Sequence, residues 1–258
     1  MTELVLREKA GGVLTLTLNR PEKKNALTPE MYRAMGEAID AAPDDPDVRC
    51  VLIRGNGDMF CAGNDLGDFA KVNQGVGDAP AGSEGNPFLS ALARARIPLV
   101  AAVQGRAVGV GVTLLLHCDL VFVAEDALLY TPFVNLALVP EAASSLLLPQ
   151  RIGHARAFSM LVLGEKVDGR TAAAWGLANA AVPADQLWAR AAEGAAQIAA
   201  LPPSAVAATK SLMVNLAAVA AQMDTEAVHF GKQLRSAEAK EAFAAFTERR
   251  APDFSRVA

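Results

Sequence analysis

Cysteine is scarce in this chain, and its copies are far apart. Only three occur among 258 residues, at Cys50, Cys61 and Cys118. Their spacing matches neither a disulfide framework nor a CxxC metal site. Cys50 lies in an apolar run, which is typical of a small core residue. We therefore expect reduced thiols, as in a cytoplasmic protein.

An excess of positive charge is also missing. Lysine and arginine number 24 against 28 aspartates and glutamates, which gives a net charge of −4. Such a chain has no overall basic field for nucleic acid, so we expect no nucleic-acid partner. An anionic small molecule can still bind through local groups, such as a few lysines or the N-termini of helices.

Membrane-spanning and secretory patterns are absent as well. The apolar run from Leu99 to Leu116 is broken by Gln104, Arg106 and three glycines. The first residues lack the basic start and the long apolar stretch of a signal peptide. Both observations favour a soluble cytoplasmic protein without a membrane partner.

Strand and helix patterns alternate over the first 150 residues, in a composition of 52% hydrophobic and 20% charged residues that is typical of globular proteins. A hairpin is predicted first, and a capped helix start follows at Thr28-Pro29-Glu30. The hairpin strands are Leu4–Leu6 and Val13–Leu18; later strands are expected at Val48–Arg54, Leu99–Val103 and Leu120–Ala124, with Ala127–Tyr130 as a short partner after a turn; helices are expected near 88–95, 111–117 and 141–148. This alternation predicts an α/β architecture with a largely buried sheet.

The second part of the chain looks helical, because the strand patterns stop at Gly153. Alanine-rich helices are predicted at His154–Leu163, Thr171–Trp175, Ala184–Leu201, Ser204–Ala221 and 224–248. Leu201-Pro202-Pro203 indicates a boundary between them. We expect a core domain over residues 1–200 and a helical C-terminal region over residues 201–258, of the kind that often packs on a neighbouring subunit.

One stretch is rich in loop-forming residues. Residues 73–87 contain four glycines and two prolines. A mobile lid over a ligand site and an ordinary surface loop are both consistent with this composition.

Two glycine-bearing segments follow strands and open helices. They are Phe60–Leu66 and Gly105–Thr113. Glycine lets a backbone approach a ligand closely, and free N–H groups at a helix start point at anionic oxygen. The second segment does not match a dinucleotide fingerprint, because Leu114 stands where Gly or Ala is needed. The chain also lacks the GxxxxGK[ST] loop of nucleotide triphosphatases and the GxSxG turn of α/β-hydrolases.

Glu141 is the only ionisable residue between Thr131 and Pro149. Desolvation in such apolar surroundings raises the pKa of a carboxyl group, which suits a general base near neutral pH. The alternative is an exposed glutamate that interacts with a helix dipole. His117, His154 and His229 show no metal-ligand spacing with Cys, Asp or Glu, so we expect no metal site.

Several of these segments, in this order, resemble the enoyl-CoA hydratase/isomerase (crotonase) superfamily over essentially the whole chain. The matching pieces are Asn19–Leu27, Cys61–Leu66, Ala102–Gly105, His117–Asp119 and the region around Pro140. The resemblance implies a crotonase (ClpP-like) spiral of ββα repeats with a helical C-terminal region. It also implies an acyl-CoA substrate, no separate cofactor, and assembly as a homotrimer or a dimer of trimers.

The resemblance assigns roles to individual positions. The backbone N–H groups of Asn64 and Val110 correspond to an oxyanion hole, in which two preorganised donors stabilise an enolate oxygen. The positions that correspond to substrate contacts are Lys24, Ala26, Leu27, Ala62, Gly63, Asp65, Leu66, Gly109 and Phe133. Lys23 and Lys24 fit either a phosphate contact or a solvated basic pair.

The two glutamates of a typical hydratase are replaced here by Thr113 and Phe133. Neither residue acts as a base at neutral pH. Glu141 occupies the slot of the catalytic glutamate in Δ3,Δ2-enoyl-CoA isomerases of the peroxisomal type, although Ala142 stands where glycine is usual. We therefore expect such an isomerase. The alternatives are an enoyl-CoA hydratase, a ring-opening CoA-ester isomerase, or a non-catalytic acyl-CoA binding module.

Overall fold

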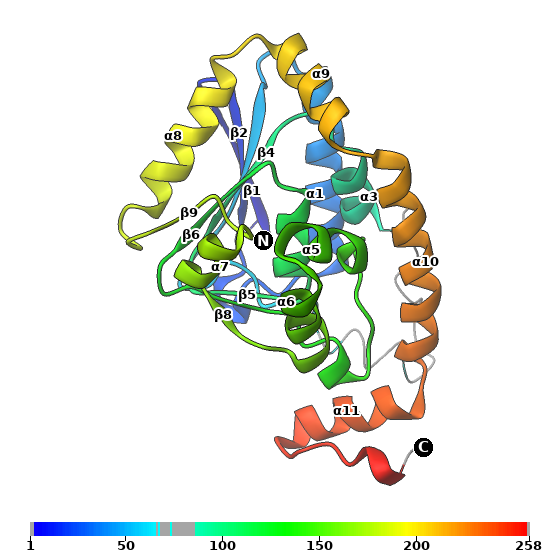
Figure 1. Ribbon diagram of the computed structural model, residues 1–258. Coiled ribbons are helices and arrows are strands. Elements are labelled where there is room, and N and C mark those ends of the chain that lie inside the picture. The colour runs from blue at the N-terminus through cyan, green and yellow to red at the C-terminus, as the bar shows by residue number, and fades with distance from the viewer. Residues whose placement is uncertain (1–2, 66, 68–72, 74–85, 257–258) are drawn as a thin grey trace.

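Figure 1 shows the computed structural model of the protein, which describes residues 3–65, 67, 73 and 86–256. Within these residues a large sheet has the strand order β1-β2-β3-β4-β6-β9. Its strands are β1 (Val5–Ala10), β2 (Val13–Leu18), β3 (Cys50–Gly55), β4 (Leu99–Val103), β6 (Leu120–Ala124) and β9 (Ala180–Val182). The prediction of an α/β architecture is confirmed.

The first two strands form the predicted hairpin, with Val5 opposite Leu18 and Ala10 opposite Val13. The remaining neighbours are parallel, from the β2–β3 pair to the β6–β9 pair. Every residue of β4 is buried, as expected for a parallel strand that is covered on both faces.

A second, smaller sheet has the order β5-β7-β8 and contains β5 (Arg106–Val108), β7 (Leu128–Tyr130) and β8 (Val167–Asp168). Two predictions were wrong here. The strand at Ala127–Tyr130 pairs with β5 and β8 and not with its chain neighbour β6. Strands also continue beyond Gly153, at β8 and β9. These strands have two and three residues, too few to show an alternating pattern, and their pairing partners define them.

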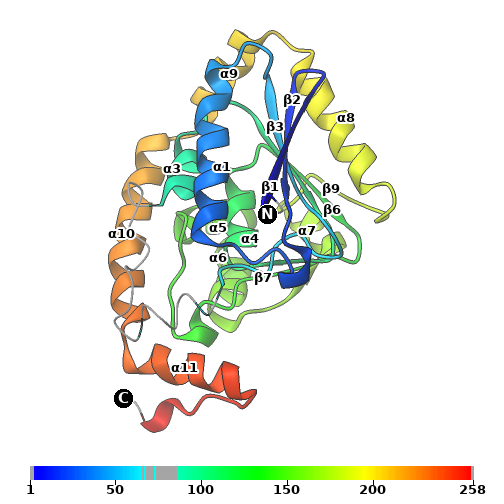
Figure 2. The same cartoon turned by 180° about the vertical axis from the view of Figure 1, so that it is seen from behind.

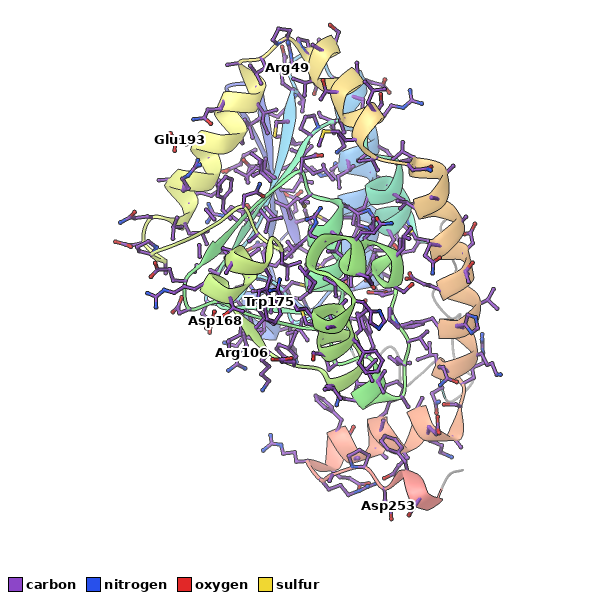
Figure 3. All side chains as sticks on the ribbon, viewed as in Figure 1. Arg49, Arg106, Asp168, Trp175, Glu193 and Asp253 are labelled. Carbon is purple, nitrogen blue, oxygen red and sulfur yellow. The ribbon has the colours of Figure 1, made fainter. Side chains whose placement is uncertain are left out.

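Helices cover the large sheet on both faces, as Figures 1 and 2 show: α8 (Leu187–Ala199) lies on one side, and α1 (Pro29–Ala41) with α3 (Pro87–Arg94) lies on the other. The Thr28 side chain accepts a hydrogen bond from Met31 N, so the predicted cap of α1 is confirmed. The two helices α1 and α3 approach closely at Gly36, where an added Cβ would lie 2.6 Å from the Pro87 carbonyl group. Figure 3 shows charged side chains such as Arg49 and Glu193 pointing away from the ribbon on the outside.

The remaining helices surround the small sheet and form the C-terminal region. They are α4 (Val110–Thr113), α5 (Ser144–Ile152), α6 (His154–Phe158), α7 (Gly169–Trp175), α9 (Pro203–Met213), α10 (Leu216–Leu234) and α11 (Ala237–Glu248). Short 3-10 segments are η1 (Pro21–Lys23), η2 (Ala42–Asp44), η3 (Leu114–His117), η4 (Val134–Leu136) and η6 (Phe254–Arg256), and η5 (Ser159–Leu163) is a π-helical segment. The helix expected from residue 141 begins at Ser144, so Glu141 lies in the preceding turn.

The C-terminal helices divide differently from the prediction. The helix expected over Ser204–Ala221 ends at Met213, and the one expected over 224–248 is interrupted at Arg235 and Ser236. The break is local, because the side chains of Asn215 and Ser236 accept hydrogen bonds from Ala218 N and Ala239 N and cap new helices. Figure 1 shows α10 running along one side of the molecule and α11 crossing its end. The division at residues 200 and 201 stays a prediction.

Within the described residues, no single helix has the length and apolar character needed to cross a bilayer. Among the described helices, only the consecutive pair α9 and α10 has that length and apolar character when the two are taken together. The pair bends by 54° at the break between them.

Candidate active site

The two glycine segments found in the sequence meet at the small sheet. Cys61 and Ala107 form a parallel bridge, and Val108 N donates to Cys61 O over 3.0 Å. A Cβ at Gly63 would lie 3.0 Å from Val108 O, and one at Gly111 would lie 2.9 Å from Cys61 O. Glycine is therefore required at both contacts, because a side chain would push the two segments apart.

The Asn64 N–H points away from its neighbouring segment. Leu27 N donates to Gly63 O over 2.8 Å, and Asp65 N donates to Leu27 O over 3.2 Å. In a parallel bridge of this kind the middle residue, Asn64, directs its own N–H to the opposite side. Within the described residues it has no backbone acceptor.

The Val110 N–H lies at the first position of α4, where a helix offers no internal acceptor. Within the described residues it too has no backbone acceptor. The preceding Gly109 has φ 54° and ψ −117°, and nothing lies within 4 Å of an added Cβ there. Gly109 N donates to Tyr130 O, which fixes this turn on β7.

Glu141 is buried, with 8% of its surface exposed, and its Oε1 atom has no hydrogen-bond partner among the described residues. Burial, followed by the charge of Glu226, raises the pKa of Glu141 to about 8. The Glu141 charge in turn contributes to raising the pKa values of Tyr32 and Cys61, after burial as the main cause. The carboxyl group therefore lies within electrostatic reach of the Cys61–Asn64 turn, and its predicted burial is confirmed.

The turn that carries Glu141 is unusual, because Ala142 and Ala143 have φ values of 59° and 56°. Glu226 on α10 accepts hydrogen bonds from Ala143 N over 2.6 Å and from Ser145 N over 2.9 Å, and a third from the Ser145 hydroxyl. On another side, His117 Nε2 lies 2.8 Å from Ala142 O. Burial lowers the pKa of His117 to about 4, so the neutral ring donates to this carbonyl.

Sequence reasoning missed two residues of this site, Glu226 and Tyr32. Glu226 falls among the buried positions Val219, Met223, Phe230 and Leu234 of α10, and an acid on an apolar helical face is a signal that the sequence did contain. Tyr32 donates from its hydroxyl to Asn64 Oδ1 over 2.6 Å. Nothing in the local sequence around Tyr32 indicates that contact.

The positions assigned to coenzyme A lie side by side. Ala62 N donates to Lys24 O over 3.0 Å, so residues 24–27 run along residues 62–65. Lys24 pairs with Asp58 through an Nζ–Oδ2 distance of 2.8 Å, and Asp65 pairs with Arg20 over 3.0 Å. Ala26 is half-buried and Leu27 is buried. Leu66 and residues 74–85 of the glycine-rich stretch lie outside the described residues.

The two positions that, by resemblance, correspond to the glutamates of a hydratase are enclosed. Thr113 is 1% exposed, and its Oγ1 has no partner among the described residues. Phe133 is buried in the hydrophobic core. In the described part of the chain, no group of three or more His, Cys, Asp or Glu side chains is arranged to hold a metal ion.

Comparisons with known proteins place this architecture in a family. The enoyl-CoA hydratase/isomerase family model matches residues 8–256. The chain is 34% identical to 1,2-epoxyphenylacetyl-CoA isomerase of Escherichia coli (strain K12) over 99% of both proteins. It is 36% identical to enoyl-CoA delta isomerase 2 of Rattus norvegicus, over 81% of this chain and 54% of that protein.

Solved structures agree. Pseudomonas aeruginosa OdaA superposes with a TM-score of 0.89 and 45% identity, over 96% of this chain and 100% of that one. An enoyl-CoA hydratase/isomerase from Pseudoalteromonas atlantica T6c superposes with a TM-score of 0.90 and 42% identity, over 98% of this chain and 100% of that one. The expected crotonase fold is thereby confirmed. The chain belongs to the enoyl-CoA hydratase/isomerase (crotonase) superfamily, as an acyl-CoA-processing enzyme.

Proposed function

We propose that this enzyme is a Δ3,Δ2-enoyl-CoA isomerase with Glu141 as its single catalytic base. The observation that carries the proposal is the state of Glu141. It is a buried carboxyl group with an oxygen unpaired among the described residues, and it lies within electrostatic reach of the Cys61–Asn64 turn. A base of this kind is desolvated and has a pKa of about 8, close to neutral pH.

The N–H groups of Asn64 and Val110 serve in this proposal as the oxyanion hole. Removal of a proton next to a thioester places negative charge on the carbonyl oxygen. Two fixed donors stabilise that charge, and the loss of one such donor costs roughly 2.7–4 kcal/mol in other enzymes. Both groups lack backbone acceptors among the described residues, which leaves them available.

The chemistry needs only one carboxylate. Ionised Glu141 takes a proton from C2 of a 3-enoyl thioester, and the electron pair moves into a dienolate whose oxygen accepts the two N–H bonds. The protonated acid then returns the proton to C4, so the double bond moves to C2–C3 and the enzyme is regenerated. Coenzyme A arrives as part of the substrate, and that no further cofactor is needed stays a prediction.

The substitutions Thr113 and Phe133 argue against hydration as the main reaction, because hydration needs a second acid to place water. A second candidate is a ring-opening isomerase of aromatic-derived CoA esters. It is favoured by the full-length similarity to the Escherichia coli 1,2-epoxyphenylacetyl-CoA isomerase. A hydratase and a non-catalytic acyl-CoA binding module are the remaining alternatives.

Incubation of a 3-enoyl-CoA with the protein in deuterated water separates these candidates. The isomerase gives a 2-enoyl-CoA product with deuterium at C2 or C4. A protein that binds the thioester but forms no 2-enoyl product and exchanges no proton contradicts the proposal. A hydratase instead makes 3-hydroxyacyl-CoA from a 2-enoyl substrate, at rates that survive Glu141→Ala. Full activity in Glu141→Gln removes Glu141 from its role.

We also propose that the chain assembles as a homotrimer or a dimer of trimers. Exposed apolar side chains on and beside α9 support an interface, since Leu212 is 88% and Met213 79% exposed. Sedimentation measurements test this directly, and a monomer at micromolar concentration contradicts it.

A further inference from the structure

Glu226 is a buried carboxylate that the isomerisation chemistry does not use. It is 5% exposed and lies on α10, more than eighty residues after the base in the chain. Its three hydrogen-bond donors all belong to residues 143 and 145, which lie two and four positions after Glu141. A buried carboxylate is costly unless such partners surround it, so its presence here needs a reason.

The hydrogen-bond directions show which form of Glu226 is present. Gln222 Nε2 donates to Ser145 Oγ over 2.8 Å, so the Ser145 hydroxyl directs its own proton to Glu226 Oε1. Oε2 accepts from Ala143 N. Burial raises the pKa of Glu226, and the donors that both of its oxygens receive act against that rise and favour the ionised form.

These bonds hold a backbone conformation that alanine avoids. Ala142 and Ala143 are both left-handed, a state in which the Cβ lies too close to the following carbonyl oxygen. Such strain persists only where the surroundings fix it. Glu226 fixes the turn from one side, and the ring of His117 fixes the Ala142 carbonyl from the other.

Building on the proposed function, we propose that Glu226 is a positioning residue for the catalytic base. It holds the 141–145 turn in its strained form, so that the Glu141 side chain stays in the apolar site, and it supplies a fixed negative charge beside it. Beside that charge ionised Glu141 is a stronger base, and the turn cannot relax and carry the carboxyl group into solvent.

Among the described residues, one charged group accounts for the electrostatic effect on Glu141. Besides Arg151 on α5, which donates to Leu115 O and Leu116 O, the turn lies near Tyr32 on α1, Cys61 in the glycine turn and His117 on η3. Tyr32 and Cys61 have raised pKa values and His117 a lowered one, so all three are neutral near pH 7. Glu226 is therefore the charge that acts on Glu141.

The first test measures the pKa of Glu141 without using activity. Carbon-13 labelling of glutamate carboxyl groups allows an NMR titration, with Glu141→Gln assigning the signal. In Glu226→Gln the titration of Glu141 moves to lower pH, because the neighbouring charge is gone. Glu8→Gln is the matched control, since it makes the same substitution at an exposed position on β1 and leaves the titration unchanged. Equal titrations in wild type and Glu226→Gln contradict the electrostatic role.

The second test measures whether Glu226 holds the turn. Ala142→Gly stabilises the wild type by removing strain, but stabilises Glu226→Gln less, because a released turn no longer forces residue 142 to be left-handed. Ala137→Gly is the control: Ala137 has φ 55° but lies outside the 141–145 turn, so its gain is the same in both backgrounds. Equal gains from Ala142→Gly in both backgrounds contradict the positioning role. If Glu226→Gln does not fold, Ser145→Ala replaces it as the background. In that background Ala142→Gly should still stabilise the protein less than it stabilises the wild type, by a smaller difference.

Kinetics complete the design. With a 3-enoyl-CoA at pH 9.5, where Glu141 is ionised in both proteins, Glu226→Gln should lose about tenfold to a hundredfold in kcat, the scale of a misplaced catalytic group, with KM nearly unchanged. An unchanged kcat contradicts the inference. If the wild type shows no isomerase activity, the proposed function fails, while the titration and the stability cycle still decide the role of Glu226.

Discussion

At the scale of single residues, the proposed function makes activity depend on the ionisation of Glu141, and the burial of Glu141 links the same ionisation to stability. The acid must lose its proton before it can accept one from the substrate. Because its pKa is about 8, we expect kcat/KM for a 3-enoyl-CoA to rise tenfold per pH unit below pH 8 and to level off above it. Initial rates at subsaturating substrate from pH 6 to 9.5 measure this profile. A plateau that already begins near pH 5 contradicts the assignment of Glu141 as a buried base.

The same raised pKa makes a prediction for folding. An ordinary glutamate has a pKa of 4.5, so between pH 4.5 and about 8 the folded protein binds more protons at Glu141 than the unfolded chain does. The contribution of Glu141 to stability is therefore greatest below pH 4.5 and falls as the pH rises to about 8, by about 1.36 kcal/mol per unit of pKa difference.

Glu141→Gln removes this dependence. The free energy of unfolding of the variant, minus that of the wild type, should grow from pH 5 to pH 8 and then stay constant. Urea denaturation at each pH measures it. Glu8→Gln, which removes an exposed carboxyl group from β1, is the matched control. A difference that shrinks with rising pH has the wrong sign for a buried acid.

At the scale of elements, the 141–145 turn is the strained entrance to α5, whose first two residues it includes. Ala142→Gly should raise the free energy of unfolding by about 0.5–1 kcal/mol, because glycine adopts a positive φ freely but also loses more entropy on folding. Thermal or urea denaturation checks this. Ala137→Gly, at another left-handed alanine, should give a similar gain. A loss of stability in Ala142→Gly shows that the alanine methyl group contributes packing that outweighs the strain.

Most elements were predictable where their own residues determine them. The Thr28 cap and the β1–β2 hairpin depend on neighbouring residues and were predicted correctly. The pairing of β7 was not, because β7 is defined by contacts with β5 and β8, residues that lie far away in the chain. The breaks around Asn215 and Ser236 were hidden by an alanine-rich sequence that favours helix on both sides of each cap.

At the scale of the whole molecule, the candidate site was only partly predictable for the same reason. Both glycine turns and Glu141 are visible as separate sequence features, and family resemblance supplies their roles. The contacts of Glu226 with residues 143 and 145 span 83 and 81 positions, and that of Tyr32 with Asn64 spans 32. Such contacts exist only after the sheet and α10 have packed, so the sequence shows Glu226 as an acid on an apolar helical face but does not indicate which residues it contacts.

One ion pair joins the C-terminal helices to the rest of the fold. Lys210 on α9 donates to Asp119 Oδ2 over 2.7 Å and to Ile97 O over 2.9 Å, with only 10% of its side chain exposed. Asp119 also accepts from Leu99 N at the start of β4. The His117-Cys118-Asp119 segment therefore helps to connect η3, the large sheet and α9.

Asp119→Ala should lower the free energy of unfolding by about 1–3 kcal/mol, because it leaves the Lys210 ammonium and the Leu99 N–H without their carboxylate. Denaturation measures the loss in the free energy of unfolding. Relative to the wild type, amide hydrogen exchange should accelerate more in α9 than in α1. The control is Asp40→Ala, which breaks a pair with Arg94 that is 40% and 61% exposed, and which should cost about 0–1 kcal/mol. Equal losses in the two variants contradict a special role for Asp119. Faster exchange throughout the chain indicates instead that α9 and the sheet unfold as one unit.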